Sequence, residues 1–168
     1  ATLQLIDKST GKIVHEWISE KEATCFTKVP VGAYRLVEIA APTEDGYVLS
    51  PEKEISIKDT PEVQNYALEN DYTKACFAKV DIDDPTKLVT GATLQLVNKA
   101  TGEVVHEWTS GDQPTCFTHL AVTDYQLVEV KIPEGQGYVT APSQDITIEA
   151  TKDTQNFTMV DDYTKVCF

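Results

Sequence analysis

A tandem repeat constrains this chain more than any other feature of its sequence. When the sequence is shifted by 91 residues, residues 1–77 align without a gap on residues 92–168, and about half of the aligned residues are identical. Only residues 78–91 have no counterpart. In a chain of 168 residues, each half is long enough to bury a core of its own. The repeat therefore predicts two similar domains in tandem.

Short stretches that alternate apolar and polar residues predict β-strands throughout both repeats. Tyr34 and Leu36 alternate with polar neighbours, and turn sequences such as KSTGK separate one stretch from the next. No segment keeps a helical period over three turns. The pattern indicates an all-β fold with one β-sandwich per repeat. We expect a first domain over residues 1–72, a second over 73–161, and the start of a further strand or a linker over 162–168.

The charge and cysteine content exclude several classes of function. A net charge of −13 and a pI near 4.5 disfavour binding to nucleic acids and to anionic membranes. No apolar run approaches the roughly 20 residues that span a bilayer. Four cysteines without a CxxC pair do not resemble a zinc or thioredoxin site, and their even number fits two disulfides formed in an oxidising compartment. We expect no metal and no cofactor.

Three ionisable residues occupy strand positions that share a face with apolar residues. Glu38 shares its face with Leu36, and Glu129 shares its face with Leu127. A buried carboxylate is costly and normally becomes protonated or finds a partner, although a strand that ends at the glutamate would leave it solvated. Lys79 poses the same question, and its simplest interpretation is a lysine on an exposed strand face.

Four motifs in a fixed order connect the chain to a known family. The sequences YRLVEIAAPTEDGY, GATLQLVNKATGEVVHEW, FAKVDI and FTMVDD together span nearly the whole chain. They resemble the Cna B-type domains, also called prealbumin-like or SpaA-type, of Gram-positive surface adhesins and pilins. The resemblance implies two Ig-like sandwiches on an extracellular protein of the cell wall or cell surface. It also implies a structural role in a stalk or pilus, with neighbouring copies or other domains of the same surface protein as partners.

In that family, a lysine on the first strand forms an isopeptide bond with an Asn or Asp on the last strand, assisted by a buried glutamate. The resemblance assigns Lys79 as the nucleophile, Asp161 as the acceptor and Glu129 as the proton shuttle of the second domain. Glu38 and Asn70 match in the first domain. A lysine amine is a nucleophile only when neutral, and a protonated acid nearby can polarise the acceptor carbonyl. The bond forms once per domain, so the protein is not expected to be an enzyme.

The first domain departs from the family pattern. It has no counterpart of residues 78–91, and therefore lacks both the first strand and the lysine that would react with Asn70. Three explanations fit: the strand was removed, it lies outside this sequence, or a neighbouring molecule supplies it to the open sheet edge. We expect the last, because residues 162–168, DYTKVCF, repeat the sequence that leads into the strand of Lys79. Chains joined in this way would form an open fibre.

Two disulfide patterns fit the resemblance. In a prealbumin-like sandwich the TCF segment is expected to run antiparallel to the first strand and to start where the last strand leaves the domain. That arrangement favours the pairs Cys25 with Cys76 and Cys116 with Cys167. The alternative joins Cys76 to Cys116 within the second domain and leaves Cys25 and Cys167 for neighbouring molecules.

Two other functions compete with the structural one. A ligand-binding adhesin would use loops such as SEKEAT and PEGQG to contact a host matrix protein. A transthyretin-like enzyme or small-molecule binder has only the fold in its favour.

Overall fold

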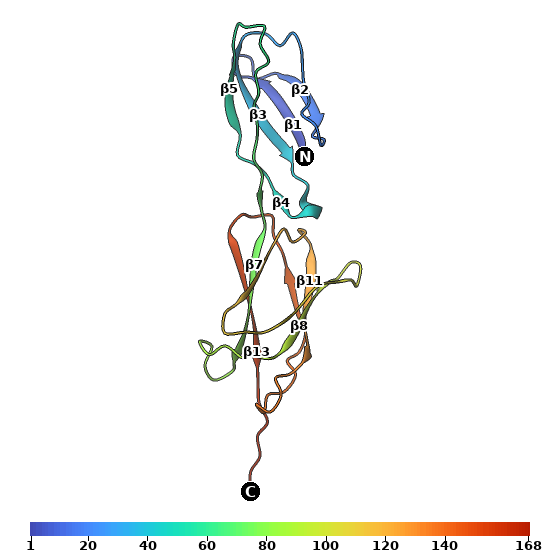
Figure 1. The fold of residues 1–168 in the computed structure, drawn as a ribbon, viewed down its shortest axis with the longest axis vertical. Coiled ribbons are helices and arrows are strands. Elements are labelled where there is room, and N and C mark those ends of the chain that lie inside the picture. The colour runs from blue at the N-terminus through green and yellow to red at the C-terminus, as the bar shows by residue number, and fades with distance from the viewer. The chain divides into compact units, whose positions relative to one another are not determined.

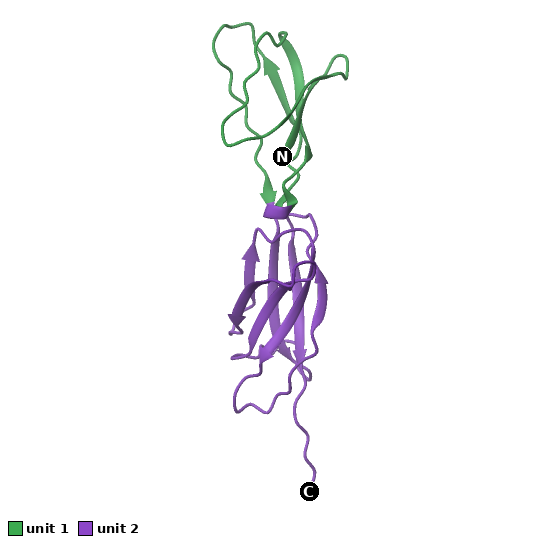
Figure 2. Cartoon of the chain, turned by 90° about the vertical axis from the view of Figure 1, so that its right-hand side faces the viewer, with its two compact units in different colours: residues 1–43, 47–71 green, residues 44–46, 72–168 purple.

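The computed structural model describes all 168 residues, and strands make up nearly all of its regular structure (Figure 1). The chain divides into two compact units (Figure 2). Unit 1 comprises residues 1–43 and 47–71, and unit 2 comprises residues 44–46 and 72–168. The prediction of an all-β chain with two tandem domains is confirmed.

Unit 2 is a complete two-sheet sandwich. The first sheet has the strand order β10-β7-β13, formed by Thr115–Thr118, Lys74–Asp81 and Thr154–Asp161. The second has the order β12-β11-β8-β9, formed by Gln144–Thr147, Asp124–Lys131, Thr93–Asn98 and Val104–Thr109. In the first sheet β7 (green in Figure 1) is the central strand, parallel to β13 and antiparallel to β10.

Strand alternation explains the core of unit 2. Leu94 and Leu96 on β8, and Tyr125 and Leu127 on β11, lie two residues apart and point toward the same side of the sheet, where they are fully buried. They pack with Met159 of β13 from the opposite sheet. The hydroxyl group of Tyr125 donates a hydrogen bond to the carbonyl oxygen of Ala121 at 3.1 Å, which satisfies its buried polar end.

Unit 1 contains only one of the two large sheets. Its strand order is β2-β1-β3-β5, formed by Ile13–Ile18, Thr2–Asp7, Gly32–Ala40 and Lys53–Ile57. A one-turn 3₁₀ helix (Thr43–Asp45) lies between β3 and β5 in the chain. Two short strands at the boundary of the units, β4 (Tyr47–Val48) and β6 (Asp71–Tyr72), form a separate ladder. The repeat equates residues 24–27 with β10 and residues 63–70 with β13, yet neither segment is a strand.

The absence of a β7 counterpart explains this difference between the units. In unit 2 both β10 and β13 pair with β7 and with no other strand. Without that central strand, residues 24–27 and 63–70 have no backbone partner to form a ladder with. The prediction that the first domain lacks its first strand is therefore confirmed.

The core of unit 1 is correspondingly smaller. Its buried apolar cluster consists of Leu5, Tyr34 and Ile55, with half-buried neighbours that include Trp17. A cavity of about 590 Å³ lies against these sheet residues, and its other walls are residues 23–29 and 58–66. The segments equivalent to β10 and β13 thus border a cavity, whereas in unit 2 they border a strand.

The two units should differ in hydrogen exchange. We expect backbone amides of residues 24–27 and 63–70 to exchange at least about tenfold faster than those of residues 115–118 and 154–161, because only the latter have strand partners. Hydrogen exchange read by mass spectrometry compares the two pairs of segments within one molecule. Equal protection of equivalent segments would contradict this description of unit 1.

Candidate functional site

Three ionisable side chains meet between the two sheets of unit 2. Lys79 lies on β7, Glu129 on β11 and Asp161 on β13. The amine Nζ of Lys79 lies 3.4 Å from Oε2 of Glu129 and forms an ion pair with Oδ1 of Asp161. All three side chains have no solvent-exposed surface. The structure thus brings together the three residues that the sequence motifs selected for the second domain.

Strand register positions this cluster. Along the parallel pair of β7 and β13, Lys79 is opposite Met159 and Asp81 is opposite Asp161, so Lys79 and Asp161 lie on adjacent strands within side-chain reach. Glu129 approaches from the facing sheet, on the same buried face as Leu127. The simpler interpretations, an exposed Lys79 and a solvated Glu129, are therefore wrong.

The surrounding residues supply hydrogen-bond partners for only some of the polar atoms in this cluster. Oε2 of Glu129 accepts a hydrogen bond from the backbone N–H of Ala141 at 2.7 Å. Apart from the ion-pair contacts, neither oxygen of Asp161 nor Oε1 of Glu129 has a hydrogen-bond partner. Burial raises the pKa of the Asp161 carboxyl group above its ordinary value, although Lys79 acts in the opposite direction. Burial therefore favours a neutral acceptor carboxyl beside the lysine.

Unit 1 contains the matching glutamate and asparagine without a lysine. Glu38 is 5% exposed, and its two carboxylate oxygens each accept a hydrogen bond at 2.8 Å from Nδ2 of Asn70. The same amide donates to the carbonyl oxygen of Val48 at 2.9 Å, and the backbone N–H of Ser50 donates to Glu38 at 2.6 Å. Glu38 is therefore buried like Glu129 and accepts the equivalent backbone hydrogen bond, because Ser50 corresponds to Ala141 in the repeat.

The cysteines pair differently from the favoured prediction. The structure contains one disulfide, between Cys76 and Cys116, and leaves Cys25 and Cys167 free and exposed. The predicted pairs Cys25 with Cys76 and Cys116 with Cys167 are wrong. Cys76 and Cys116 lie directly opposite each other on the antiparallel strands β7 and β10, with their Cα atoms 4.0 Å apart.

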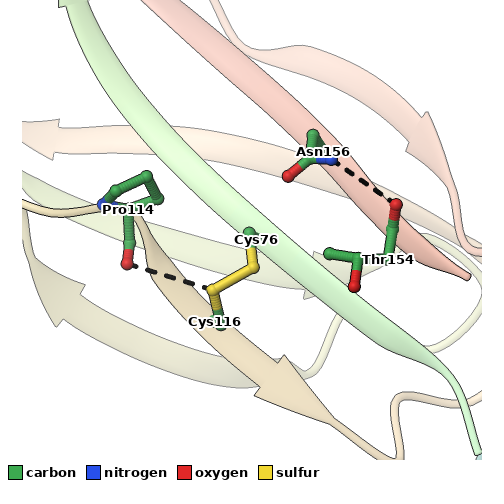
Figure 3. Close-up of a disulfide and its surroundings, with 5 residues drawn as sticks. All are labelled: Cys76, Pro114, Cys116, Thr154 and Asn156. Atoms are coloured by element: carbon green, nitrogen blue, oxygen red, sulfur yellow. Dashed lines mark hydrogen bonds between the residues drawn. A yellow bond between two sulfur atoms is a disulfide. The ribbon is translucent and has the colours of Figure 1, made fainter.

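Figure 3 shows how this disulfide sits in the sheet. Cys76 is on the central strand, with Cys116 on one flanking strand and Asn156 on the other. Cys76 is therefore bonded to a strand neighbour within its own domain, and not to Cys25 of the other repeat.

A polar cluster at the end of β7 was missed by the sequence analysis. Oδ2 of Asp81 accepts hydrogen bonds from the hydroxyl group of Tyr138 at 2.7 Å and from Nζ of Lys87 at 3.1 Å. Through these donors and the backbone N–H of Asp83, the pKa of Asp81 falls from its usual 3.8 to about 2. No sequence signal predicts it, because Tyr138 is 57 residues away in the chain.

Neither a metal site nor a membrane-spanning helix is found. No group of three or more His, Cys, Asp or Glu side chains is placed to hold a metal ion. None of the helical structure is long and apolar enough to cross a bilayer.

Removal of the Cys76–Cys116 disulfide should destabilise unit 2. The bond closes a loop between residues 40 positions apart, and replacing both cysteines by serine should lower the free energy of unfolding of unit 2 by about 2–4 kcal/mol. Denaturant unfolding monitored by tryptophan fluorescence measures the change. Cys25→Ser is the matched control and should leave unit 2 unchanged; an equal loss in both variants would contradict the assignment.

Asp81 should contribute to the acid stability of unit 2. Its pKa is lowered to about 2 in the folded state, so folding favours the ionised form. The resulting stabilisation is complete above the unfolded pKa near 3.8 and is lost as the pH falls through about 2. Wild-type protein should therefore lose more stability than Asp81→Asn between pH 5 and pH 2 in denaturant titrations. Parallel losses in both proteins would show that Asp81 does not contribute.

Comparison with known proteins identifies the fold family of both units. The family model of the SpaA prealbumin-like fold domain matches residues 1–72 and again residues 73–163. No curated protein sequence matches the chain. Among solved structures, the Bacillus anthracis TIE protein is 24% identical with a TM-score of 0.59, over 96% of this chain and 30% of that one. The chain thus spans less than a third of that protein, and the likeness concerns the fold.

Two pilins are also similar at lower scores. GBS52, the minor pilin of Streptococcus agalactiae, is 17% identical with a TM-score of 0.49, over 85% of this chain and 65% of the pilin. The shaft pilin SpaA from Lactobacillus rhamnosus GG is 16% identical with a TM-score of 0.43, over 98% and 70% of the two chains. Because the family model accounts for both halves, this chain belongs to the family of SpaA prealbumin-like fold domains and contains two of them in tandem.

Proposed function

We propose that this chain is a structural module of a stalk or pilus on the cell wall of a Gram-positive bacterium, and that its second domain forms an isopeptide bond between Lys79 and Asp161. The observation that carries the proposal is the cluster of Lys79, Glu129 and Asp161, fully buried and in mutual contact. Membership of a pilin-type domain family supports a structural rather than an enzymatic role.

The reaction balances within the cluster. A proton moves from Nζ of Lys79 to Oε2 of Glu129, 3.4 Å away, and leaves a neutral amine beside the protonated Asp161 carboxyl group. The amine attacks Cγ of Asp161, while the protonated Glu129 donates a hydrogen bond to the acceptor and returns a proton to the departing hydroxyl. Glu129 then takes the second proton from the attacking nitrogen, so that an amide forms between Nζ and Cγ, one water molecule leaves, and Glu129 ends protonated.

Burial of the cluster favours the reaction by lowering its barrier and by stabilising its neutral product. Holding amine and carboxyl in contact replaces a bimolecular condensation by an intramolecular one, which can lower the barrier by roughly 7–11 kcal/mol. The product is a neutral amide, so the reaction also removes a charged pair from the apolar interior, where each ion costs several kcal/mol of desolvation. Phe77 and Tyr125, both 2% exposed, belong to the core that excludes water from this interior.

The position of the bond suits a load-bearing role. The chain enters the sandwich through β7 and leaves it through β13, and the two strands are parallel neighbours. A bond from Lys79 to Asp161 joins the entering strand to the leaving strand. Tension would then pass through the amide, and the segment between these residues would not extend.

The first domain needs a strand from elsewhere for the same chemistry. Glu38 and Asn70 are already hydrogen-bonded to each other, and the cavity of unit 1 lies where the repeat places a β7 counterpart. We propose that a strand of another copy, or of another domain of the same surface protein, completes this sandwich. Contact with a host matrix protein through the SEKEAT and PEGQG loops stays a separate prediction, tested by binding measurements on loop variants.

Intact mass measured under reducing conditions tests the bond in the second domain. The wild-type chain should be lighter than its sequence mass by about 18 Da, because amidation expels one water molecule. Glu129→Gln removes the proton shuttle and should give the full mass. Glu103→Gln changes an exposed glutamate to the same residue and should keep the deficit.

A second variant separates loss of chemistry from loss of folding. Asp161→Asn keeps an acceptor and should react with expulsion of ammonia, which gives a deficit of about 17 Da. Full mass in the folded wild-type protein would overturn the proposed bond.

A further inference from the structure

We infer that residues 137–141 form a strap that holds the isopeptide residues of the second domain in place, and that Tyr138 is the positioning residue that fastens this strap to Asp81. Its role rests on the proposed bond between Lys79 and Asp161. The hydroxyl group of Tyr138 forms no hydrogen bond with the three reacting side chains. Tyr138 therefore acts on the rate of the reaction only through the residues that it positions.

The strap joins the strand of the lysine to the glutamate. It lies between β11 and β12 in the chain, and only Tyr138 and Ala141 within it are buried. The hydroxyl group of Tyr138 donates a hydrogen bond to Oδ2 of Asp81, on β7, at 2.7 Å. Three residues later, the backbone N–H of Ala141 donates to Oε2 of Glu129, on β11, at 2.7 Å. One short segment thus contacts both β7 and the proton shuttle.

A third contact ties the strap to the acceptor strand. The backbone N–H of Val139 donates to the carbonyl oxygen of Asp162 at 2.9 Å. Asp162 directly follows Asp161, which is the last residue of β13. The strap is therefore hydrogen-bonded beside each of the three strands that carry a reacting side chain.

Strand pairing ends or becomes irregular beside two of the reacting groups. Both β7 and β13 end at the opposed pair of Asp81 and Asp161, and backbone pairs at the end of an element open most easily. On β11, the register with β8 shifts directly after Glu129. A displacement of about 1 Å can slow a positioned reaction about 100-fold, so an anchor at this end of the sandwich matters for the chemistry.

Asp81 provides a strong anchor for the strap. Its Oδ1 accepts a hydrogen bond from the backbone N–H of Asp83 at 2.9 Å, and its Oδ2 accepts a second one from Nζ of Lys87 at 3.1 Å. The hydrogen bond from Tyr138 is the largest of the causes that lower the pKa of Asp81 to about 2, so this carboxylate is ionised at neutral pH. A hydrogen bond to an ionised acceptor is roughly twice as strong as one between neutral groups.

The anchor is also tied to the backbone of the lysine. The backbone N–H of Asp81 donates to the carbonyl oxygen of Lys87 at 3.2 Å. Two residues further on, the backbone N–H of Val89 donates to the carbonyl oxygen of Lys79 at 2.8 Å. Asp81 and Lys79 lie two residues apart on β7, so their side chains point toward the same face. A shift of Asp81 would therefore be passed on to the amine that attacks Asp161.

The rate of bond formation tests the strap. Tyr138→Phe removes the hydroxyl group and keeps the ring, so the cluster stays covered and loses its anchor. The full chain is synthesised in a cell-free reaction, samples are stopped in acid at intervals and reduced, and the intact mass gives the fraction that has lost about 18 Da. We expect the first-order rate constant of Tyr138→Phe to lie at least about tenfold below that of the wild-type chain, with the same final deficit.

Tyr163→Phe is the matched control. It removes a hydroxyl group that donates to the carboxylate of Asp83 at the same end of the domain but outside the strap, and should leave the rate unchanged. A wild-type rate in Tyr138→Phe, or equal slowing of the two variants, would overturn the positioning role of Tyr138.

Substitutions of Asp81 separate positioning from folding. Asp81→Ala removes the acceptor and should slow bond formation at least about tenfold. Asp81→Asn keeps an acceptor oxygen for the hydroxyl group of Tyr138 and should restore most of the rate. If Tyr138→Phe and Asp81→Ala instead react at the wild-type rate in a smaller fraction of the molecules, the two residues serve folding alone and the positioning role is overturned.

Hydrogen exchange reads the strap separately from the bond. Full mass in the wild-type protein would overturn the bond itself, whereas the amide of Ala141 reports on the strap with or without it. This amide, followed by NMR, should exchange at least about fivefold faster in Tyr138→Phe than in Tyr163→Phe. Equal exchange in the two variants would show that Tyr138 does not hold the strap on Glu129 and would overturn the inference.

Discussion

The contact between Lys79 and Asp161 is the interaction on which the rest of unit 2 depends. A lysine amine and a carboxyl group, both fully buried, would be costly apart, and each is tolerated because the other lies beside it. Their positions require β7 and β13 to be parallel neighbours in one register. Glu129 must then come from the facing sheet. The two sheets of the sandwich hold these three groups in contact and exclude water from them.

The strand β7 has the same importance for the sheet that it has for the site. It pairs with two strands, carries Lys79 and carries Cys76, which joins it to β10. Unit 1 shows the consequence of its absence within the same chain. The second sheet of the sandwich does not form, the buried cluster shrinks, and a cavity takes the place of the strand. Glu38 and Asn70 nevertheless remain paired, so the acceptor half of the site does not need the strand to form.

Much of this could be predicted from the sequence, because the repeat and the two-residue period of the strands identify the domains and their inward positions. Lys79 alone looked like an exposed lysine, and only its place in the ordered motifs indicated a partner. The prediction of the disulfide pairs was wrong for a physical reason: whether Cys76 faces Cys25 or Cys116 depends on which TCF segment lies beside β7. The repeat makes the two segments equivalent. The hydrogen bonds of Asp81 escaped prediction because Tyr138 approaches it only in the folded chain.

The most direct test of a load-bearing cross-link is the length of the chain under force. With reductant present, the protein is stretched from its two ends, and its full extension is compared with that of Glu129→Gln. The account predicts that the wild-type chain is shorter by about 280 Å, since the roughly 80 residues between Lys79 and Asp161 would extend by about 3.5 Å each in the variant alone. Equal extension of the two proteins would contradict it.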